Sequence, residues 1–245
     1  MSRAGSPPPE FAQTLASQHI ELDAGDQDRL AVHLDALLEA NERFNLTAVR
    51  EPAQAWVRHV ADSLSLVPFV AEAGCRQVID LGSGGGFPGV PLAIAMPEVQ
   101  WTLVESVGKK ARFLQETIDR LGLSNAQVRQ ARAEDLAAFK TGVREQMDAV
   151  VCRAVGGLAS LVELAVPLLK VDGLLLAIKG EKAPEEIAAA TRALNELHAE
   201  VAATHRTPTG TIVAVRKLAK TSRLYPRGQG LPARKPLGGT PPDPE

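Results

Sequence analysis

The chain has 245 residues, the length of one large domain or of one domain with an appendage. Its formal charge is -2, with 45% hydrophobic and 23% charged residues, a composition that excludes collagen, a coiled coil and general disorder. A generic nucleic-acid binder is usually strongly basic, so the net charge does not favour one.

The cysteine content and the lack of long apolar runs indicate the cellular compartment of the protein. Cys75 and Cys152 are the only cysteines, too few for a disulfide framework or a cysteine-rich metal site. No apolar run approaches the roughly 18 residues of a membrane helix, and residues 1–9 lack the apolar core of a signal peptide. We therefore expect a metal-free cytoplasmic protein with reduced thiols and no membrane attachment. We also expect a monomer.

The first part of the chain predicts a disordered end followed by helices. Pro7, Pro8 and Pro9 predict that residues 1–10 are extended or disordered, since proline provides no amide donor. Apolar side chains then recur at helical spacing, which predicts a small helical N-terminal segment over residues 11–72. The residues that carry this pattern are Leu30, Leu34, Leu37, Leu38 and Asn41, then Trp56, Val60, Leu64 and Val67.

From Gln77 on, short apolar runs alternate with longer amphipathic stretches, which predicts a parallel sheet covered by helices on both faces. The last two runs flank residues 207–210 with no room for a helix, so we expect a terminal antiparallel hairpin at the sheet edge. We assign residues 73–218 to this domain and 219–245 to a basic, Pro-rich tail. The expected strands are 78–81, 99–105, 126–130, 148–152, 174–178, 201–204 and 211–215, and the expected helices are 88–96, 109–121, 158–170 and 184–197.

The most informative stretch runs from Val78 to Gly89, where a buried strand turns on glycines into a helix. Glycines allow positive φ and let a ligand approach the backbone closely. Such a turn presents its amides at the carboxyl ends of the strands, the usual ligand site of an open α/β sheet. We therefore expect a bound cofactor at this loop.

Two cofactors fit the loop. Residues 84–89 match the dinucleotide fingerprint Gly-x-Gly-x-x-Gly, with Glu105 about 20 residues downstream. Residues 80–86 have instead the spacing Asp-x-Gly-x-Gly-x-Gly of S-adenosylmethionine methyltransferases. Asp80 can supply the negative charge that the ammonium of methionine needs, and Glu105 can accept hydrogen bonds from ribose hydroxyls with either cofactor.

Several further motifs accompany the loop. They are Phe44-Asn45-Leu46-Thr47, Arg58–Leu64, Asp80–Gly89, Glu105-Ser106 with Lys109-Lys110, Arg153-Ala154, Leu176–Gly180, and Tyr225-Pro226-Arg227 with Gly230-Leu231-Pro232. Together, over about residues 44–237, they resemble the bacterial 16S ribosomal RNA (guanine-N7) methyltransferase G family, formerly called glucose-inhibited division protein B. The resemblance implies a Rossmann-like class I S-adenosylmethionine methyltransferase with a seven-stranded, mostly parallel α/β sheet. It also implies one guanine in the decoding-centre loop of 16S rRNA, in the small ribosomal subunit, as substrate.

By motif position, the resemblance also implies which residues bind the cofactor. Phe87 stands where some members have an aliphatic residue, and it would also suit packing at a helix start. Ala133 and Glu134 fit an adenine edge read by backbone groups, although Glu134 would also suit the first turn of a helix. His59 and Asn45, otherwise ordinary helix-surface or capping residues, come to the rim of the pocket only by the resemblance. The implied cofactor contacts are Gly82, Phe87, Glu105, Ala133, Glu134 and Arg153.

Methylation of guanine N7 needs no general base, because that nitrogen has a free lone pair at pH 7, so catalysis can rest on alignment of the reacting atoms. Accordingly we assign no catalytic base. Cys152 could be a nucleophile, as in cytosine-C5 methyltransferases, but it continues an apolar run and fits a buried strand position better. Arg153 and Lys179 end two strands and are positioning candidates, for a carboxylate, a base edge or an RNA phosphate.

Local charge favours RNA although the net charge does not. Lys109, Lys110 and Arg112 lie at a helix start, where they oppose the helix dipole unless they face an anion. A basic run near the C-terminus can neutralise phosphates, or it can form a solvated tail. This run contains Arg216, Lys217, Lys220, Arg223, Arg227, Arg234 and Lys235, with no acidic residue until Asp243.

Two other functions stay open on the sequence alone. A nicotinamide-dependent oxidoreductase would use the dinucleotide pattern, but it needs a proton donor, and the one tyrosine, Tyr225, lies in the tail. A non-catalytic RNA-assembly factor would bind the cofactor without turnover.

Overall fold

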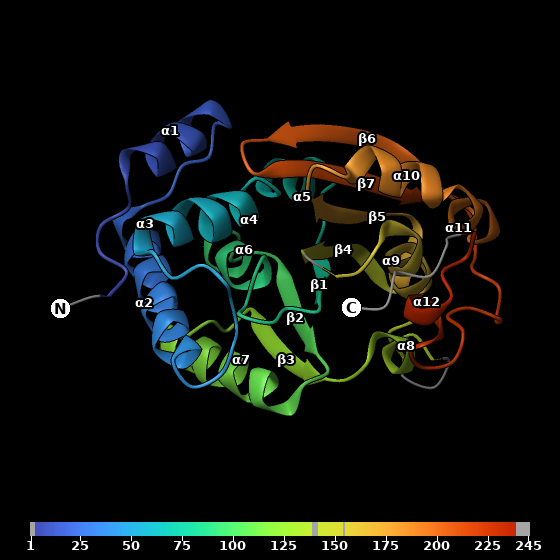
Figure 1. The fold of residues 1–245 in the computed structure, drawn as a ribbon, viewed down its shortest axis with the longest axis horizontal. Helices are drawn as coiled ribbons and strands as arrows, with labels where there is room; N and C mark the ends of the chain where they lie inside the picture. The colour runs from blue at the N-terminus through green and yellow to red at the C-terminus, as the bar shows by residue number, and fades with distance from the viewer. Residues whose placement is uncertain (1–2, 139–141, 154, 239–245) are drawn as a thin grey trace.

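The computed structural model describes residues 3–138, 142–153 and 155–238. Ala154, which belongs to one motif of the resemblance, and the prolines from residue 241 on lie outside the described residues. Figure 1 shows one twisted sheet with helices on both faces and a group of N-terminal helices beside it.

The sheet has seven strands in the order β3-β2-β1-β4-β5-β7-β6. The pairs among β1 to β5 are parallel, whereas β7 is antiparallel to both β5 and β6. This confirms the predicted mostly parallel sheet with a terminal hairpin, of which β6 forms the edge. The strands are β1 (Gln77–Leu81), β2 (Gln100–Glu105), β3 (Ala126–Gln130), β4 (Met147–Arg153), β5 (Leu169–Lys179), β6 (Ala199–Thr207) and β7 (Gly210–Lys217).

The strand order reverses at β1, since β2 lies on one side of it and β4 on the other. The carboxyl end of β1 is therefore a topological switch point, where ligands bind in open α/β sheets. Asp80 stands one residue before this end, in register with Leu103 of β2 and Val151 of β4. The glycine loop that follows consequently lies at the centre of the carboxyl edge of the sheet.

Strand side chains alternate between two apolar cores, one on each face. Val78 and Val151 join one core, Ile79 and Val150 the other, and this double burial explains the nearly continuous apolar runs. The predicted helix 158–170 is shorter in the structure, because β5 already begins at Leu169. No helix in the described ranges combines the length and apolarity needed to cross a bilayer. The covering helices are α6 (Gly89–Ala95), α7 (Gly108–Leu121), α8 (Ala133–Leu136), α9 (Leu158–Ala165), α10 (Ala183–Ala189) and α11 (Thr191–Glu196), with a 3₁₀ turn at Val166–Leu168.

The N-terminal segment is helical, as predicted, but it begins earlier than expected. Residues 3–8 do not extend away from the fold, because the Ala4 amide donates to Asp35 Oδ1 at 2.6 Å and the buried indole of Trp56 donates to the Ala4 carbonyl at 3.1 Å. One turn is a π-helix, which the apolar pattern did not predict. The elements are α1 (Pro9–Ser17), α2 (Ala24–Asn41), α3 (Pro52–Ala55), the π-helix η1 (Trp56–Ala61), α4 (Asp62–Leu64) and α5 (Val67–Glu72).

The described part of the C-terminal tail, residues 219–238 with the short helix α12 (Leu231–Arg234), also differs from an extended run. The buried guanidinium of Arg144 donates to the carbonyls of Thr221, Ser222 and Tyr225 at 2.8–3.0 Å and so holds the tail against the domain. Lys217, a member of the basic run that could neutralise phosphates or be solvated, is instead fully buried and donates to Glu145 Oε1 at 2.8 Å. The cations of the run that remain exposed are Arg216, Lys220, Arg223, Arg234 and Lys235.

Candidate active site

The glycine loop turns back onto the end of β2. The amides of Gly82 and Ser83 both donate to the Val104 carbonyl, at 2.9 and 3.1 Å. Gly82 and Gly86 have φ of +76° and +91°, a region that favours glycine. A Cβ at Gly86 would lie 2.9 Å from His33 Nε2, so this position also needs glycine for lack of space.

Two carboxylates flank the loop, as the sequence predicted. Asp80 is fully buried, and its Oδ2 accepts from the Gly89 amide at 2.9 Å, while its Oδ1 has no hydrogen-bond partner among the described residues. Burial raises the pKa of Asp80 to about 7. Glu105, at the end of β2, accepts from the Gly84 amide at 3.1 Å and from the Val107 amide at 2.8 Å.

These residues fit the cofactor that the sequence favoured. A buried carboxylate oxygen without a partner is rare in folded proteins, and a ligand's ammonium would satisfy the one on Asp80. The glycine backbone is also crowded, since a Cβ at Gly82 would lie 2.7 Å from Val155 Cγ2. The unpartnered oxygen of Asp80 therefore gives the loop an acceptor for the ammonium of a methionine-derived ligand.

Phe87 lies in a stack of side chains between the N-terminal helices and the sheet. Its ring centroid is 4.6 Å from that of His33 and 4.8 Å from that of His59, and the Arg153 guanidinium lies 5.1 Å from it. The side chain is 4% exposed. The packing role that the sequence also allowed for Phe87 is therefore present in the structure.

Arg153 and His59 join β4 to the N-terminal helices. Arg153 Nη1 donates to the Arg58 carbonyl at 2.6 Å and to His59 Nδ1 at 2.9 Å, and it lies 3.8 Å from Asp62 Oδ2. A guanidinium only donates, so Nδ1 of His59 is the acceptor, and its Nε2 carries the proton that Thr47 Oγ1 accepts at 2.7 Å. Burial and the neighbouring charge of Arg153 lower the pKa of His59 to about 3, which leaves the ring neutral at pH 7.

His33 is a residue of the site that the sequence analysis did not single out. It is fully buried on α2, and its Nε2 contacts the Gly85 carbonyl at 2.8 Å, which fixes the helix to the glycine loop. Burial lowers its pKa to about 4, so the neutral ring donates this bond. The signal was present, because His33 occupies the same apolar stripe as Leu30 and Leu37 and a polar residue there needs a partner.

Of the remaining predicted site residues, Ala133 and Glu134 lie near the proposed pocket and Lys179 is engaged elsewhere. The backbone at Ala133 and Glu134 lies near Glu105, since the Ala131 amide donates to the Glu105 carbonyl at 3.2 Å. The Glu134 carboxylate points to the C-terminal segment, where it accepts from the Gly230 amide at 2.8 Å. Lys179 is not placed to meet an RNA phosphate. It is 6% exposed and donates to the Gly156 carbonyl and to Glu186 Oε2, at 2.6 and 2.8 Å.

Comparison with known proteins decides the family. The sequence profile of the family described as rRNA small subunit methyltransferase G matches residues 26–213. The Ribosomal RNA small subunit methyltransferase G of Sorangium cellulosum is 44% identical to this chain, with 90% of this chain and 92% of that protein covered. The protein of the same name from Desulfitobacterium hafniense is 40% identical, with 93% and 97% covered. The chain belongs to the rRNA small subunit methyltransferase G family.

Solved structures confirm the class I methyltransferase fold for this family member. A putative O-methyltransferase from Klebsiella pneumoniae matches with a TM-score of 0.56 and 16% identity, over 84% of this chain and 96% of that one. An O-methyltransferase from Bacillus cereus in complex with SAH matches with a TM-score of 0.56 and 18% identity, over the same shares. The family assignment replaces the alternative of a nicotinamide-dependent oxidoreductase, and the hydroxyl of the one tyrosine, Tyr225, donates to Glu196 on α11.

Cys152→Ser is expected to retain most methyl transfer by this methyltransferase. Cys152 is fully buried in β4, and burial raises the pKa of its thiol to about 12, so no thiolate forms near neutral pH. The buried hydroxyl should lower the free energy of unfolding by about 1–3 kcal/mol. Cys75→Ser, at another buried cysteine outside the site, is the matched control in a single-turnover assay with small-subunit rRNA. Complete loss of transfer in Cys152→Ser alone would identify a cysteine nucleophile.

Proposed function

We propose that this chain transfers a methyl group from S-adenosylmethionine to N7 of one guanine in the decoding-centre loop of small-subunit rRNA. The observation that carries the proposal is the pair of carboxylates around the glycine loop, Asp80 with its unpartnered oxygen and Glu105 at the neighbouring strand end. The family supplies rRNA of the small subunit as the substrate class, and a neighbour of the same fold was solved in complex with SAH.

Each proposed contact residue binds a particular part of the cofactor. Asp80 would accept from the methionine ammonium, Glu105 from the ribose hydroxyls, and the backbone at Ala133 would border the adenine. S-adenosylmethionine, when bound, supplies an electrophilic methyl group on a sulfonium. The residues proposed to surround it are Gly82, Phe87, Glu105, Ala133, Glu134 and Arg153, with Asp80.

The chemistry asks little of the protein beyond alignment. Guanine N7 reacts through its own lone pair, so no residue has to accept a proton before the transfer. Of the two histidines near the loop, His59 has both ring nitrogens engaged. The His33 ring is packed against Phe87 and is fully buried, although its Nδ1 has no hydrogen-bond partner among the described residues. We assign to Arg153 the task of holding the N-terminal helices over the pocket, through the Arg58 carbonyl and His59.

The groove between α2 and α7 is the proposed docking surface for rRNA phosphates. It has a volume of about 390 Å³, and Phe44 lies at one side, with Lys109 Nζ 5.4 Å from its ring centroid. α7 begins three residues after Glu105, so the groove leads toward the proposed pocket. Its cations outnumber its acids, which complements a phosphate backbone. The charged residues that line it are Arg43, Lys109, Arg112 and Arg120, with Glu39 and Glu116.

Replacing Lys109 and Arg112 together with alanine is expected to weaken binding to small-subunit rRNA, because two phosphate contacts are lost. The slope of log affinity against log salt should become shallower by about 1.4–1.8, and affinity for S-adenosylmethionine should not change. The matched control removes two exposed cations near the other edge of the sheet, Lys182 and Arg206. Filter binding over a salt series measures both, and an equal loss in the two double variants would rule out the groove.

Mass spectrometry of 16S rRNA tests the function directly. Cells that lack the gene should lose one methyl group, and the purified protein should restore it in vitro. Borohydride reduction followed by aniline cleaves RNA at 7-methylguanine, so a break at that nucleotide in treated rRNA assigns the nitrogen. A restored methyl group without this cleavage would contradict N7 as the acceptor. Binding of S-adenosylmethionine without any restoration would favour the non-catalytic assembly factor.

A further inference from the structure

We propose that Arg227 is a positioning residue for the cofactor site: its ion pair with Glu163 fixes a turn of the C-terminal segment, and that turn holds α8 in place. The inference rests on the proposed function, in which the backbone at the start of α8 borders the adenine. It gives a role to the motif Tyr225-Pro226-Arg227, which the chemistry of methyl transfer leaves unexplained.

The carboxylate of this ion pair, on Glu163, is fully buried. Glu163 is the one charged residue of α9 and is 0% exposed. Arg227 donates to it from Nε at 2.8 and 3.1 Å, from Nη2 at 2.6 Å and from its own amide at 2.9 Å. Such a fork-shaped arrangement fixes direction as well as charge, which a lysine could not reproduce.

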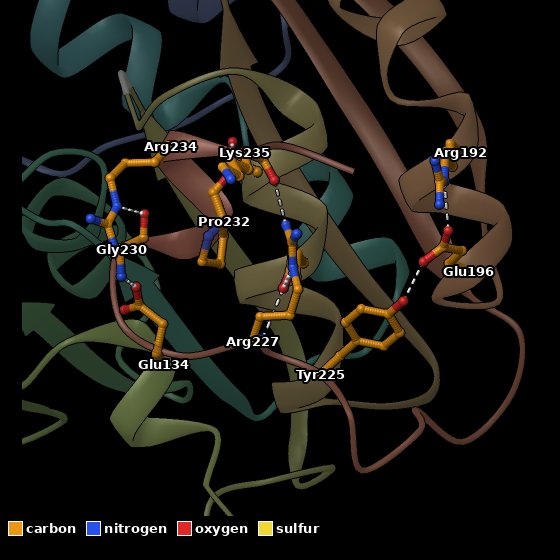
Figure 2. A network of polar contacts seen from close by, with 11 residues as sticks. Glu134, Arg192, Glu196, Tyr225, Arg227, Gly230, Pro232, Arg234 and Lys235 are labelled. Atoms are coloured by element: carbon orange, nitrogen blue, oxygen red, sulfur yellow. Dashed lines mark hydrogen bonds and ion pairs between the residues drawn. The ribbon is translucent and has the colours of Figure 1, made fainter. Parts of the chain in front are cut away.

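The same guanidinium closes the turn. Arg227 Nη2 also donates to the Lys235 carbonyl at 2.7 Å, so both ends of residues 227–235 meet at one group (Figure 2). Ser160 of α9 donates to the Pro232 carbonyl at 2.8 Å. Within this frame Gly230 has φ of +70°, a conformation that few other residues adopt readily.

The turn forms hydrogen bonds with two adjacent residues of α8. The Gly230 amide donates to Glu134 Oε1 at 2.8 Å, as Figure 2 shows. Gln229 Nε2 donates to both oxygens of Asp135, each at 2.7 Å. α8 has four residues, too few to be stable by itself, so its position depends on such contacts. Because α8 starts two residues after Ala131, which is bonded to Glu105, any movement of it reaches the proposed ribose and adenine end of the pocket.

The first test removes the exposed hydrogen bonds between the turn and α8. Gln229→Ala removes the contact with Asp135 and leaves the buried ion pair intact. We expect the Kd for S-adenosylmethionine to rise by about fivefold, at the low end of coupling between distinct sites, with kcat and the KM for rRNA unchanged. Arg192→Ala is the matched control, since it breaks a neighbouring exposed pair with Glu196 that does not touch α8. Equal Kd values in Gln229→Ala and wild type would overturn the proposal.

A second pair of variants separates position from stability. Arg227→Leu alone leaves a buried carboxylate unpaired and should lower the melting temperature. The double variant Arg227→Leu, Glu163→Leu removes both charges and should recover stability, as apolar replacement of buried pairs often does. If Arg227 acts by position, the double variant still binds S-adenosylmethionine about tenfold more weakly than wild type. Recovery of affinity together with stability would show a purely structural role.

Hydrogen exchange gives an independent readout on the unmodified protein. Coupling is reciprocal, so S-adenosylmethionine should slow exchange of the Gly230 amide, and unchanged exchange would count against the inference. Failure of the proposed function is distinguishable from failure of this inference. In the first case wild type does not bind S-adenosylmethionine, whereas in the second it binds and the tail variants bind equally well.

Discussion

Gly82→Val is expected to abolish detectable binding of S-adenosylmethionine by titration calorimetry. Gly82 has φ of +76°, which a β-branched residue rarely adopts, and its Cβ would lie 2.7 Å from Val155 Cγ2. The new side chain would therefore clash with Val155 and displace the loop backbone that forms the proposed cofactor site. The backbone strain should also lower the free energy of unfolding by about 1–3 kcal/mol.

A second glycine with positive φ, outside the site, serves as a control for the effect of backbone strain alone. Gly74 has φ of +62° at the end of α5, and a Cβ there would meet no atom within 4 Å. Gly74→Val should therefore show a similar loss of stability while it binds S-adenosylmethionine normally. Normal binding by Gly82→Val would refute the assignment of the glycine loop to the cofactor.

The central sheet was predictable because its physical signals are local. β1, β2, β4 and the second half of β5 are short apolar runs buried on both faces, so they stand out from the helices between them, whereas the edge strand β3 is partly exposed and more polar. The boundaries that were wrong depend on partners far along the chain. Leu169 extends β5 because it pairs with Met147, and the apolar pattern from 158 to 170 contains no sign of that pairing.

The site was predictable in its charges but not in its internal contacts. The positions of Asp80 and Glu105 follow from strand ends and spacing, which are sequence properties. Lys179 shows the limit of this reasoning, because only the fold reveals that Glu186 already neutralises it. Glu163 is similar: a carboxylate inside an apolar helix signals that a partner exists, but its identity, Arg227, lies 64 residues away.

The described parts of both chain ends, residues 3–8 and 219–238, pack against the domain for one reason. Proline content predicted that the ends are extended or disordered, yet buried polar groups of the domain need partners that these segments provide. The indole of Trp56 finds the Ala4 carbonyl, and the guanidinium of Arg144 finds the carbonyls of Thr221 and Ser222. Backbone carbonyls have no sequence signature, so contacts of this kind appear only once the fold is known.

Asp80→Asn is expected to weaken binding of S-adenosylmethionine by at least tenfold, because a hydrogen bond to a charged group is worth about 1.5–3 kcal/mol. In wild type the affinity should fall as the pH drops below 7. Burial raises the pKa of Asp80 to about 7, so at lower pH the carboxyl must lose a proton before it can pair with the ammonium. The Kd is expected to rise by about 16-fold between pH 7 and 5.5, with most of the rise below pH 6.5. The α-amino group has a pKa of about 7.7–8.0, so it stays charged over this pH range.

The variant should show no such pH dependence, since asparagine keeps an acceptor for the Gly89 amide and carries no charge. 5′-Methylthioadenosine, which lacks the amino-acid part, is the matched ligand, and neither pH nor Asp80→Asn should alter its affinity. His33 and His59 do not interfere, because burial lowers the pKa of these rings to about 4 and 3. The variant should also gain stability relative to wild type as the pH rises toward 7, because only wild type must then bury an ionised carboxylate. Equal affinity of wild type and variant at pH 7.5 would mean that the unpartnered oxygen of Asp80 does not face the ammonium, and the cofactor would have to bind by Glu105 and the loop amides alone.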